Sequence, residues 1–250
     1  MSRDKSNRRF EGYITHRHGM SIQIGLAMLQ GARHEHAQAI LGAAKELGVD
    51  VEVKILREAE DLITGIDALV LPGGESTTMR IASRHSGLLD ALYQVITNNP
   101  ELPVLGTCAG AILMCSPNND TSPLLDATIS RNAWGRQVDS FQSPIDVKLD
   151  SEYVEPKETG IVVTDSCHMP LAIEKEFHDD EATFPGIFIR APRFSSVGKN
   201  ASVIAELNGE VVGVRQDSRI GLTFHPELTS DRRFHRWIIS KAISRSVEMN

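Results

Sequence analysis

Hydrophobic residues follow two different periods along the first half of the chain. Short apolar runs bounded by glycine, proline or polar residues predict strands, and apolar residues that recur every three or four positions predict helices. Strand patterns lie at residues 21–29, 49–57, 66–74 and 102–106, and helical patterns lie at 30–48, 84–98 and from 109 onward. Strands that alternate with helices are typical of a parallel sheet covered on both faces, so the pattern predicts an α/β fold.

The helix predicted within residues 30–48 shows the helical spacing clearly. Gly48 follows its last apolar residue and is placed to end it, because glycine readily adopts the backbone conformation that terminates a helix. The apolar residues at helical spacing are Ala37, Ile40, Leu41, Ala44 and Leu47.

The second half of the chain reads as strands and turns with fewer helices. Strand patterns lie at residues 127–141, 185–194, 201–216 and 219–227. A closing helix is predicted over 231–246, where Phe234, Trp237, Ile238 and Ala242 share one face. Long structureless loops are uncommon in compact domains, so some structure is expected in the acidic segment 144–183.

Length and composition fit a single domain. With 250 residues, 41% hydrophobic and 5% aromatic, the chain suits one compact domain over 21–250 with an insertion at about 144–183. Residues 1–20 are a polar tail that we expect to be disordered. Met20 directly precedes the first strand pattern, so we interpret Met20 as the true start and the tail as an extension.

The charge balance and the cysteines argue against several classes of protein. Lys and Arg number 26 against 33 Asp and Glu, and this net charge of −7 without a basic run predicts no nucleic-acid partner. No apolar stretch could span a membrane or serve as a secretory signal, which predicts a soluble cytoplasmic protein. Cys108, Cys115 and Cys167 form no C-x-x-C pair, so neither a disulfide scaffold nor a structural zinc site is expected.

Cys108 lies in the most informative stretch, Gly106-Thr107-Cys108-Ala109-Gly110, between a predicted strand and a predicted helix. A nucleophile flanked in this way by two glycines is the nucleophile-elbow pattern, here with cysteine in place of serine. The turn would lift the sulfur above the carboxyl end of the sheet, and the following helix would favour the thiolate. The backbone N–H of Ala109 would face a developing oxyanion. The alternative interpretation is a small buried cysteine in a tight turn.

A thiolate nucleophile needs a base, and the base needs an orienting group. His225 and Glu227 follow a predicted strand two positions apart, so in extended chain they would project to the same side. A histidine and a glutamate in a surface loop are the alternative. The remaining histidines with no comparable setting are interpreted as surface or packing residues: His34, His36, His85, His168, His178 and His235.

The segment Leu71 to Thr77, LPGGEST, joins a predicted strand to a helical segment. Gly73 and Gly74 can offer backbone N–H groups to an oxyanion, and Glu75 can receive an ammonium group. A simple turn with a helix N-cap at Ser76 is the alternative. A phosphate loop fits less well, because the G-K-[ST] signature is missing and Glu75 would repel phosphate.

Taken in order, PGG, GTCAG and HPE resemble the class I glutamine amidotransferases. LQGARHEH, PGGESTTM, GTCAGAILM, RNAWGRQVDSF, FIRAP and FHPELTSD are similar to motifs of the glutaminase subunits of pyridoxal 5′-phosphate synthase. The resemblance covers about residues 21–143 and 184–240. It implies a flavodoxin-like three-layer α/β sandwich with a mostly parallel central sheet, which hydrolyses L-glutamine to L-glutamate and ammonia.

The resemblance also implies roles for residues and a partner. Cys108 matches the nucleophile, His225 the base and Glu227 the residue that orients the histidine. The ammonia would pass to a pyridoxal 5′-phosphate synthase subunit in a large hetero-oligomer, and no metal or organic cofactor is expected in this chain. The implied oxyanion hole is Gly73, Gly74 and Ala109; the implied glutamine contacts are Gly74, Glu75, Ser76, Arg131, Ile189 and Arg190; Gln30 matches a residue that senses the partner.

Three other interpretations stay open at this point. The glutaminase subunit of another amidotransferase, such as imidazole glycerol phosphate synthase, shares the triad but would not be expected to carry PGGEST with RNAWGRQ and FIRAP. A cysteine hydrolase or chaperone-like protein of the same fold would act alone, since fold does not fix function. A non-catalytic protein with a relic site is disfavoured by the intact Cys108, His225 and Glu227.

Overall fold

The structure is a computed structural model, and it describes residues 21–31, 33–117, 121–131, 140–149, 163–164, 170–171 and 183–248. The first half contains β1 (Ile22–Ala27), α2 (Arg33–Leu47), β2 (Val51–Leu56), the 3₁₀-helix η1 (Ala59–Leu62), β3 (Ala68–Leu71), α3 (Ser76–Ser86), α4 (Leu88–Asn98), β4 (Val104–Thr107) and α5 (Ala109–Cys115). The second half contains β5 (Ala127–Ser130), β6 (Ser140–Val147), β7 (Val163–Thr164), β8 (Pro170–Leu171), β9 (Thr183–Ile189), β10 (Arg193–Val197), β11 (Ser202–Leu207), β12 (Glu210–Gln216), β13 (Arg219–Leu222), the 3₁₀-helix η2 (Pro226–Leu228) and α6 (Arg233–Glu248).

Within the described residues, nine strands form one sheet in the order β2-β1-β3-β4-β13-β12-β11-β6-β9. The first five strands pair in parallel, and their order is that of the flavodoxin-like fold. The other strands pair antiparallel, so the sheet is mixed around a parallel core. A tight hairpin joins β11 to β12 through Asn208 and Gly209, which both have positive φ as a two-residue turn requires. The predicted α/β fold is confirmed.

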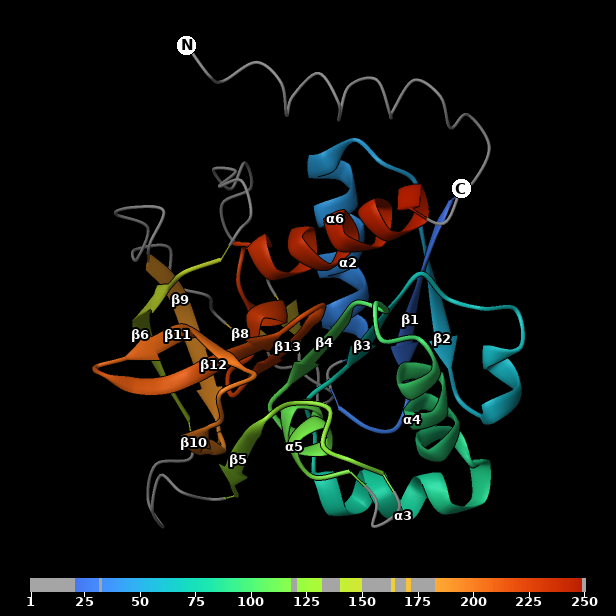
Figure 1. The fold of residues 1–250 in the computed structure, drawn as a ribbon. Helices are drawn as coiled ribbons and strands as arrows, with labels where there is room; N and C mark the ends of the chain where they lie inside the picture. Colours follow the sequence, from blue (N-terminus) through green and yellow to red (C-terminus); the bar gives the residue numbers. More distant parts are fainter. Residues whose placement is uncertain are drawn as a thin grey trace.

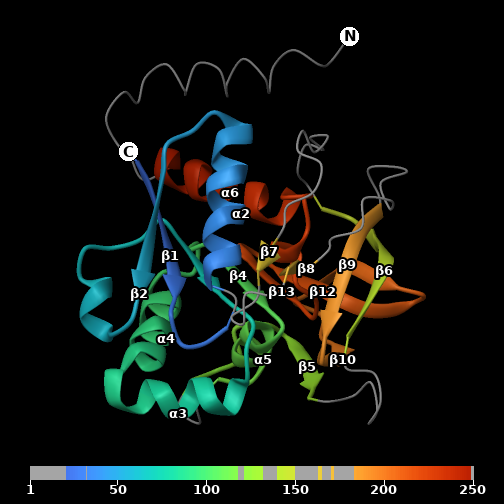
Figure 2. The same ribbon diagram turned by 180° about the vertical axis from the view of Figure 1, so that it is seen from behind.

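The sheet separates two helical layers, as Figures 1 and 2 show. Helices α2 and α6 cover one face, and α3, α4 and α5 cover the other. Strand β3 illustrates how the sequence builds both layers, since successive side chains point to opposite faces. Ala68 and Val70 pack in the cluster that includes α2 and α6, whereas Leu69 and Leu71 pack in the cluster that includes α4 and α5.

Two predictions about helices were wrong in detail. The single helix predicted over 84–98 is two helices, because Gly87 adopts a left-handed φ of 63° that ends α3 and precedes α4. In α2 the predicted apolar set includes Leu41, which is 51% exposed. The other four residues of the set are buried or partly buried. The buried face also includes His36 and Ala39, because this face packs against α6 and η2.

The whole predicted tail and most of the predicted insertion lie outside the described residues. The ends of the 144–183 segment belong to the central sheet, where Asp146 of β6 pairs with Thr183 of β9. Within the segment, β7 and β8 pair with each other. The tail 1–20 and the rest of the insertion stay predictions. Among the described residues, no helix is long and apolar enough to cross a membrane.

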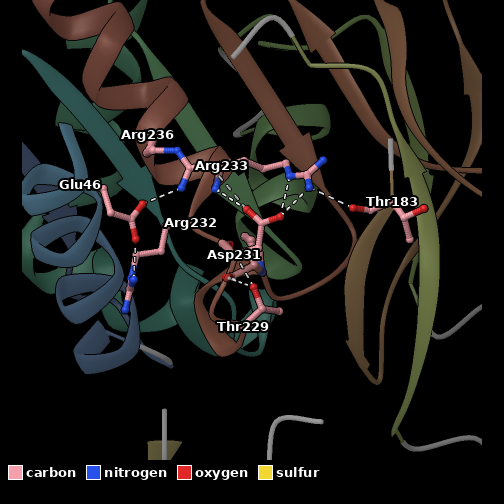
Figure 3. Close-up of polar contacts among 8 residues, drawn as sticks. Glu46, Thr183, Thr229, Asp231, Arg232, Arg233 and Arg236 are labelled. Carbon is pink, nitrogen blue, oxygen red and sulfur yellow. Dashed lines mark hydrogen bonds and ion pairs between the residues drawn. The ribbon is translucent and has the colours of Figure 1, made fainter. Parts of the chain in front are cut away.

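A network of buried ion pairs ties α2, α6 and β9 together (Figure 3). Glu46 of α2 binds Arg232 and Arg236, each at 2.6 Å. Asp231 accepts hydrogen bonds from Arg233, which also donates to the carbonyl oxygen of Thr183 at 2.9 Å. The network therefore fixes the start of α6, which directly follows the segment that carries His225 and Glu227.

Replacing Glu46 by glutamine is expected to lower the free energy of unfolding by about 3 kcal/mol, because two nearly buried guanidinium groups lose their carboxylate. Chemical unfolding of both proteins would measure the change. The control is Glu52→Gln, since Glu52 makes an exposed hydrogen bond with Gln23 and its loss should change stability by at most about 0.5 kcal/mol. Equal losses of unfolding free energy in the two variants would contradict the stabilising role of the Glu46 ion pairs.

Candidate active site

Cys108 stands at the sharp turn between β4 and α5. Its φ of 48° and ψ of −105° are unusual for a residue with a side chain, and they are the strained geometry that a nucleophile elbow requires. The backbone N–H of Cys108 bonds to the carbonyl oxygen of Leu222 at 2.8 Å, which anchors the turn to β13. The side chain lies at the carboxyl end of the parallel strands, where open α/β sheets bind ligands.

The two glycines of the motif are required by close packing. A Cβ at Gly110 would lie 2.0 Å from the carbonyl oxygen of Leu71 in β3. A Cβ at Gly106 would lie 2.5 Å from the sulfur of Met114 and 2.9 Å from the backbone of Gly110. The turn can therefore hold Cys108 against the sheet only because neither flanking residue carries a side chain.

A Gly110→Ala variant is expected to be about 3 kcal/mol less stable than the wild type, because the added methyl meets backbone that cannot rotate away. Gly48→Ala is the matched control. Gly48 has a φ of 67° and open space around it, so this variant should lose only about 1 kcal/mol from backbone strain. Thermal unfolding that ranks Gly48→Ala as the more damaging change would contradict the packing argument.

His225 and Glu227 meet each other directly and lie next to Cys108. The Nδ1 atom of His225 is 2.7 Å from Oε1 of Glu227. The imidazole also lies near Cys108, because a Cβ added to Gly73 would contact both side chains. Both side chains are buried. The prediction that extended chain would align the pair was wrong. His225 instead precedes the 3₁₀-helix η2, which begins at Pro226, and this turn brings Glu227 back onto the imidazole.

The electrostatics of the pair favour charge on both partners. Burial alone would lower the pKa of His225, but the Glu227 carboxylate and the nearby Cys108 outweigh burial and raise it to about 10. Burial alone would raise the pKa of Glu227, but His36 and His225 outweigh it and lower the pKa to about 2. An ionised carboxylate is therefore available to hold the imidazolium form of His225.

The PGG turn packs against this pair from the side. A Cβ at Gly73 would lie 2.6 Å from Cε1 of His225 and 3.4 Å from Cβ of Cys108. The loop containing Gln30 approaches the same turn, since a Cβ at Gly31 would lie 1.9 Å from the carbonyl oxygen of Gly73. The structure thus places Gly73, one of the predicted oxyanion-hole residues, next to Cys108. Ala109, another of them, follows Cys108 as the first residue of α5.

Gln30 and Glu75 are joined across these two loops. The side-chain oxygen of Gln30 accepts a hydrogen bond from the backbone N–H of Glu75 at 3.0 Å. Glu75, rather than Ser76, is the N-cap of α3, and its carboxylate accepts from the backbone N–H groups of Thr77 and Thr78. Hydrogen bonds from Thr78 and from these N–H groups lower the pKa of Glu75 to about 2. The carboxylate is exposed and charged, as an ammonium-binding group must be.

Two other predicted sets of glutamine contacts lie at the end of β5 and at the end of β9. Nη1 of Arg131 donates to Oγ1 of Thr77 at 3.1 Å, beside the start of α3. Arg131 also lines a cavity of about 480 Å³ to which Cys108 does not contribute. Ile189 ends β9, and Arg190 follows with a φ of 44°. The link from β9 to the triad runs through the backbone, since the N–H of His225 bonds to the carbonyl oxygen of Ile187 at 2.8 Å.

Sequence reasoning missed two histidines at this site. His36 and His235 are fully buried and contact each other, and His36 lies 3.3 Å from Glu227. Their interpretation as surface or packing residues missed these polar contacts. A signal was present, because His36 precedes Ala39 and Ile40 at helical spacing on the buried face of α2.

The sequence is similar to a known protein family over most of its length. The sequence profile of the SNO glutamine amidotransferase family matches residues 26–158 and 164–244, which is well over half of the chain. The chain belongs to the SNO glutamine amidotransferase family. This membership confirms the resemblance inferred from the sequence motifs.

Relatives and one solved structure agree with the SNO family assignment. The pyridoxal 5′-phosphate synthase subunit PdxT of Thermococcus gammatolerans is 37% identical over 229 residues, which cover 89% of this chain and 100% of the relative. PdxT of Methanothermobacter thermautotrophicus is 32% identical over a region that covers 89% of this chain and 98% of the relative. A glutamine amidotransferase crystal structure is 33% identical with a TM-score of 0.63, covering 88% of this chain and 98% of that one. A glutamine amidotransferase from Thermotoga maritima shares the fold. It is 15% identical with a TM-score of 0.51, and the match covers 92% of this chain and 86% of that one.

Proposed function

We propose that this SNO-family chain is the glutaminase subunit of a pyridoxal 5′-phosphate synthase. It hydrolyses L-glutamine to L-glutamate and ammonia, and it delivers the ammonia to a separate synthase subunit. The observation that carries the proposal is the hydrogen bond of Glu227 with His225, together with the position of His225 beside Gly73 and Cys108 at the elbow that follows β4. The PdxT relatives, which the chain matches along almost their whole length, support the choice of partner.

The first half of the reaction forms a thioester. The Cys108 sulfur attacks the side-chain amide carbon of glutamine while His225 holds the thiol proton as an imidazolium. The tetrahedral intermediate collapses when the C–N bond breaks and His225 gives that proton to the departing ammonia. The raised pKa of His225, near 10, suits a group that must keep this proton during the attack.

The second half of the reaction releases glutamate. Neutral His225 takes a proton from a water molecule, whose oxygen attacks the thioester carbon. The C–S bond then breaks, glutamate leaves, and the proton returns to the Cys108–His225 pair. Glu227 stays ionised throughout, because its pKa is lowered to about 2. Its carboxylate holds Nδ1 of His225 in the required orientation at 2.7 Å.

The surrounding residues are proposed to bind the oxyanion and the two charged ends of glutamine. Backbone N–H groups of the Gly73–Gly74 turn and of Ala109 stabilise the oxyanion; removing one such donor typically costs about 2.7–4 kcal/mol of transition-state stabilisation. The Glu75 carboxylate suits the ammonium group, and Arg131 suits a carboxylate through paired hydrogen bonds. Ser76 and the Ile189–Arg190 segment complete the proposed substrate contacts, and Gln30 is proposed to sense the partner through its bond to Glu75.

The test is glutamate release from L-glutamine, measured with and without a pyridoxal 5′-phosphate synthase subunit. We expect hydrolysis that rises when this partner is added. As a control, the synthase subunit of imidazole glycerol phosphate synthase should give no rise. Activation by that control subunit alone would contradict the proposed pathway, and the absence of hydrolysis in every mixture would contradict the proposed chemistry. The large hetero-oligomer and the cytoplasmic location belong to the same proposal.

A further inference from the structure

His36 lies on the side of Glu227 away from the base. It projects from α2 into the layer between that helix and α6, and it is fully buried. Its Nε2 atom is 3.3 Å from Oε2 of Glu227 and 3.1 Å from Oγ1 of Thr107, the residue before Cys108. Its other nitrogen, Nδ1, is 3.1 Å from Nε2 of His235 on α6. His36 therefore contacts both the orienting carboxylate and the strand end that carries the nucleophile.

The donors and acceptors along this chain fit one proton arrangement. Oε1 of Glu227 accepts from Nδ1 of His225, so Oε2 needs a donor of its own. Oε2 has no hydrogen-bond partner among the described residues, and Nε2 of His36 lies 3.3 Å away, within ion-pair distance but outside hydrogen-bond geometry. An ionised carboxylate can only accept and the Thr107 hydroxyl can also accept, so a proton on Nε2 of His36 serves both Oε2 of Glu227 and Oγ1 of Thr107. Nδ1 of His36 then accepts from Nε2–H of His235.

The buried setting agrees with neutral rings in this arrangement. Burial lowers the pKa of His36 despite the nearby carboxylate, and burial together with His36 lowers the pKa of His235 to about 3. Each neutral imidazole has one donor and one acceptor nitrogen, as the chain of contacts demands. A metal site is not an alternative explanation, because no group of three or more His, Cys, Asp or Glu within the described residues could hold an ion.

We propose that His36 is a positioning residue for the triad. Its Nε2–H holds the second oxygen of Glu227, so that the first oxygen stays directed at Nδ1 of His225, while His235 fixes the tautomer of His36. The catalytic consequence rests on the proposed function of Cys108, His225 and Glu227. A carboxylate held at only one oxygen can rotate about its terminal torsion, which is soft, and would then present the imidazole at the wrong angle. His36 prevents that rotation without touching the substrate.

Three variants test this role in the complex with the synthase subunit. His36→Leu removes the donor and should lower kcat by about 10- to 100-fold, the size expected for losing one hydrogen bond to a charged group, with KM changed less than about 3-fold. His36→Gln can place an amide N–H near the same point and should recover kcat to within about 3-fold of the wild type. Glu46→Gln weakens the same α2–α6 contact without touching the triad, so it should lower stability and leave kcat unchanged.

Two further measurements do not depend on glutamine hydrolysis. The alkylation rate of Cys108 by iodoacetamide, followed by mass spectrometry of its peptide, should fall in His36→Leu and recover in His36→Gln. In the wild type, nitrogen NMR of the imidazole rings should find His36 neutral with its proton on Nε2. A proton on Nδ1 of His36, or His36→Leu with unchanged kcat and unchanged alkylation, would overturn the positioning role. Wild-type protein that fails to hydrolyse glutamine yet shows the expected tautomer and alkylation rates would instead overturn the proposed function alone.

Discussion

Replacing Cys108 by alanine is expected to lower kcat for glutamine hydrolysis on the order of 10⁶-fold, the size seen when a nucleophile that works as part of a triad is removed. The reason is that no thioester can form, whereas the rest of the site stays in place. Alanine is smaller than cysteine, so it introduces no clash at the turn between β4 and α5. Glutamate release in the presence of the synthase subunit measures the loss, and circular dichroism checks that the variant is folded.

Cys115→Ala is the matched control for this prediction. Cys115 lies at the end of the same helix, where burial raises the pKa of its thiol to about 12 and keeps it protonated at neutral pH. A protonated, buried thiol is a poor nucleophile, so this variant should keep its kcat. If Cys115→Ala lost activity as completely as Cys108→Ala, the assignment of the nucleophile would be wrong.

Replacing Glu227 by glutamine is expected to lower kcat on the order of 10⁴-fold, as occurs when the orienting carboxylate of a triad becomes an amide. The amide can no longer stabilise the imidazolium of His225. Burial lowers the pKa of His225 and the Glu227 carboxylate opposes burial, so the variant should have a lower His225 pKa than the wild-type value near 10. At neutral pH the variant therefore has less imidazolium to protonate the leaving ammonia.

Kinetics and an NMR titration of the His225 ring test this prediction together. Glu52→Gln serves as the control, since it also removes one negative charge but lies in an exposed pair with Gln23 on β1 and β2. The control should change neither kcat nor the His225 pKa. A His225 pKa that stayed the same, or rose, in Glu227→Gln would show that another group holds the imidazolium.

Local patterns predicted much of the fold. Gly48 ends α2 as expected, and the strand runs and the face of α6 with Trp237 were recognised because each depends on neighbouring residues only. The Gly87 boundary was missed, since apolar residues continue at helical spacing across it and only its left-handed φ separates α3 from α4. The exposure of Leu41 could not be predicted either, because it depends on where α6 packs against α2.

The candidate site also contains parts that local sequence predicts and parts that it does not. The GTCAG elbow and the HPE pair indicate their chemistry by residue type and spacing. The cap of α3 is less predictable, because Glu75 and Ser76 can both cap a helix and only the backbone geometry selects Glu75. His36 and His235 are 199 positions apart in the sequence, so their contact appears only once α2 and α6 pack together. Residues 132–139, the rest of the motif that begins at Arg131, lie outside the described residues.

The most direct test of the central claim is to trap the glutamine-reactive residue. The chain and the proposed synthase subunit are incubated with a glutamine analogue that carries a diazo ketone in place of the amide, and the peptides are then analysed by mass spectrometry. We predict one adduct on Cys108, which excess L-glutamine prevents and which forms more slowly in Glu227→Gln. An adduct on another cysteine, or labelling of Cys108 that glutamine does not prevent, would contradict the claim that this thiol attacks glutamine.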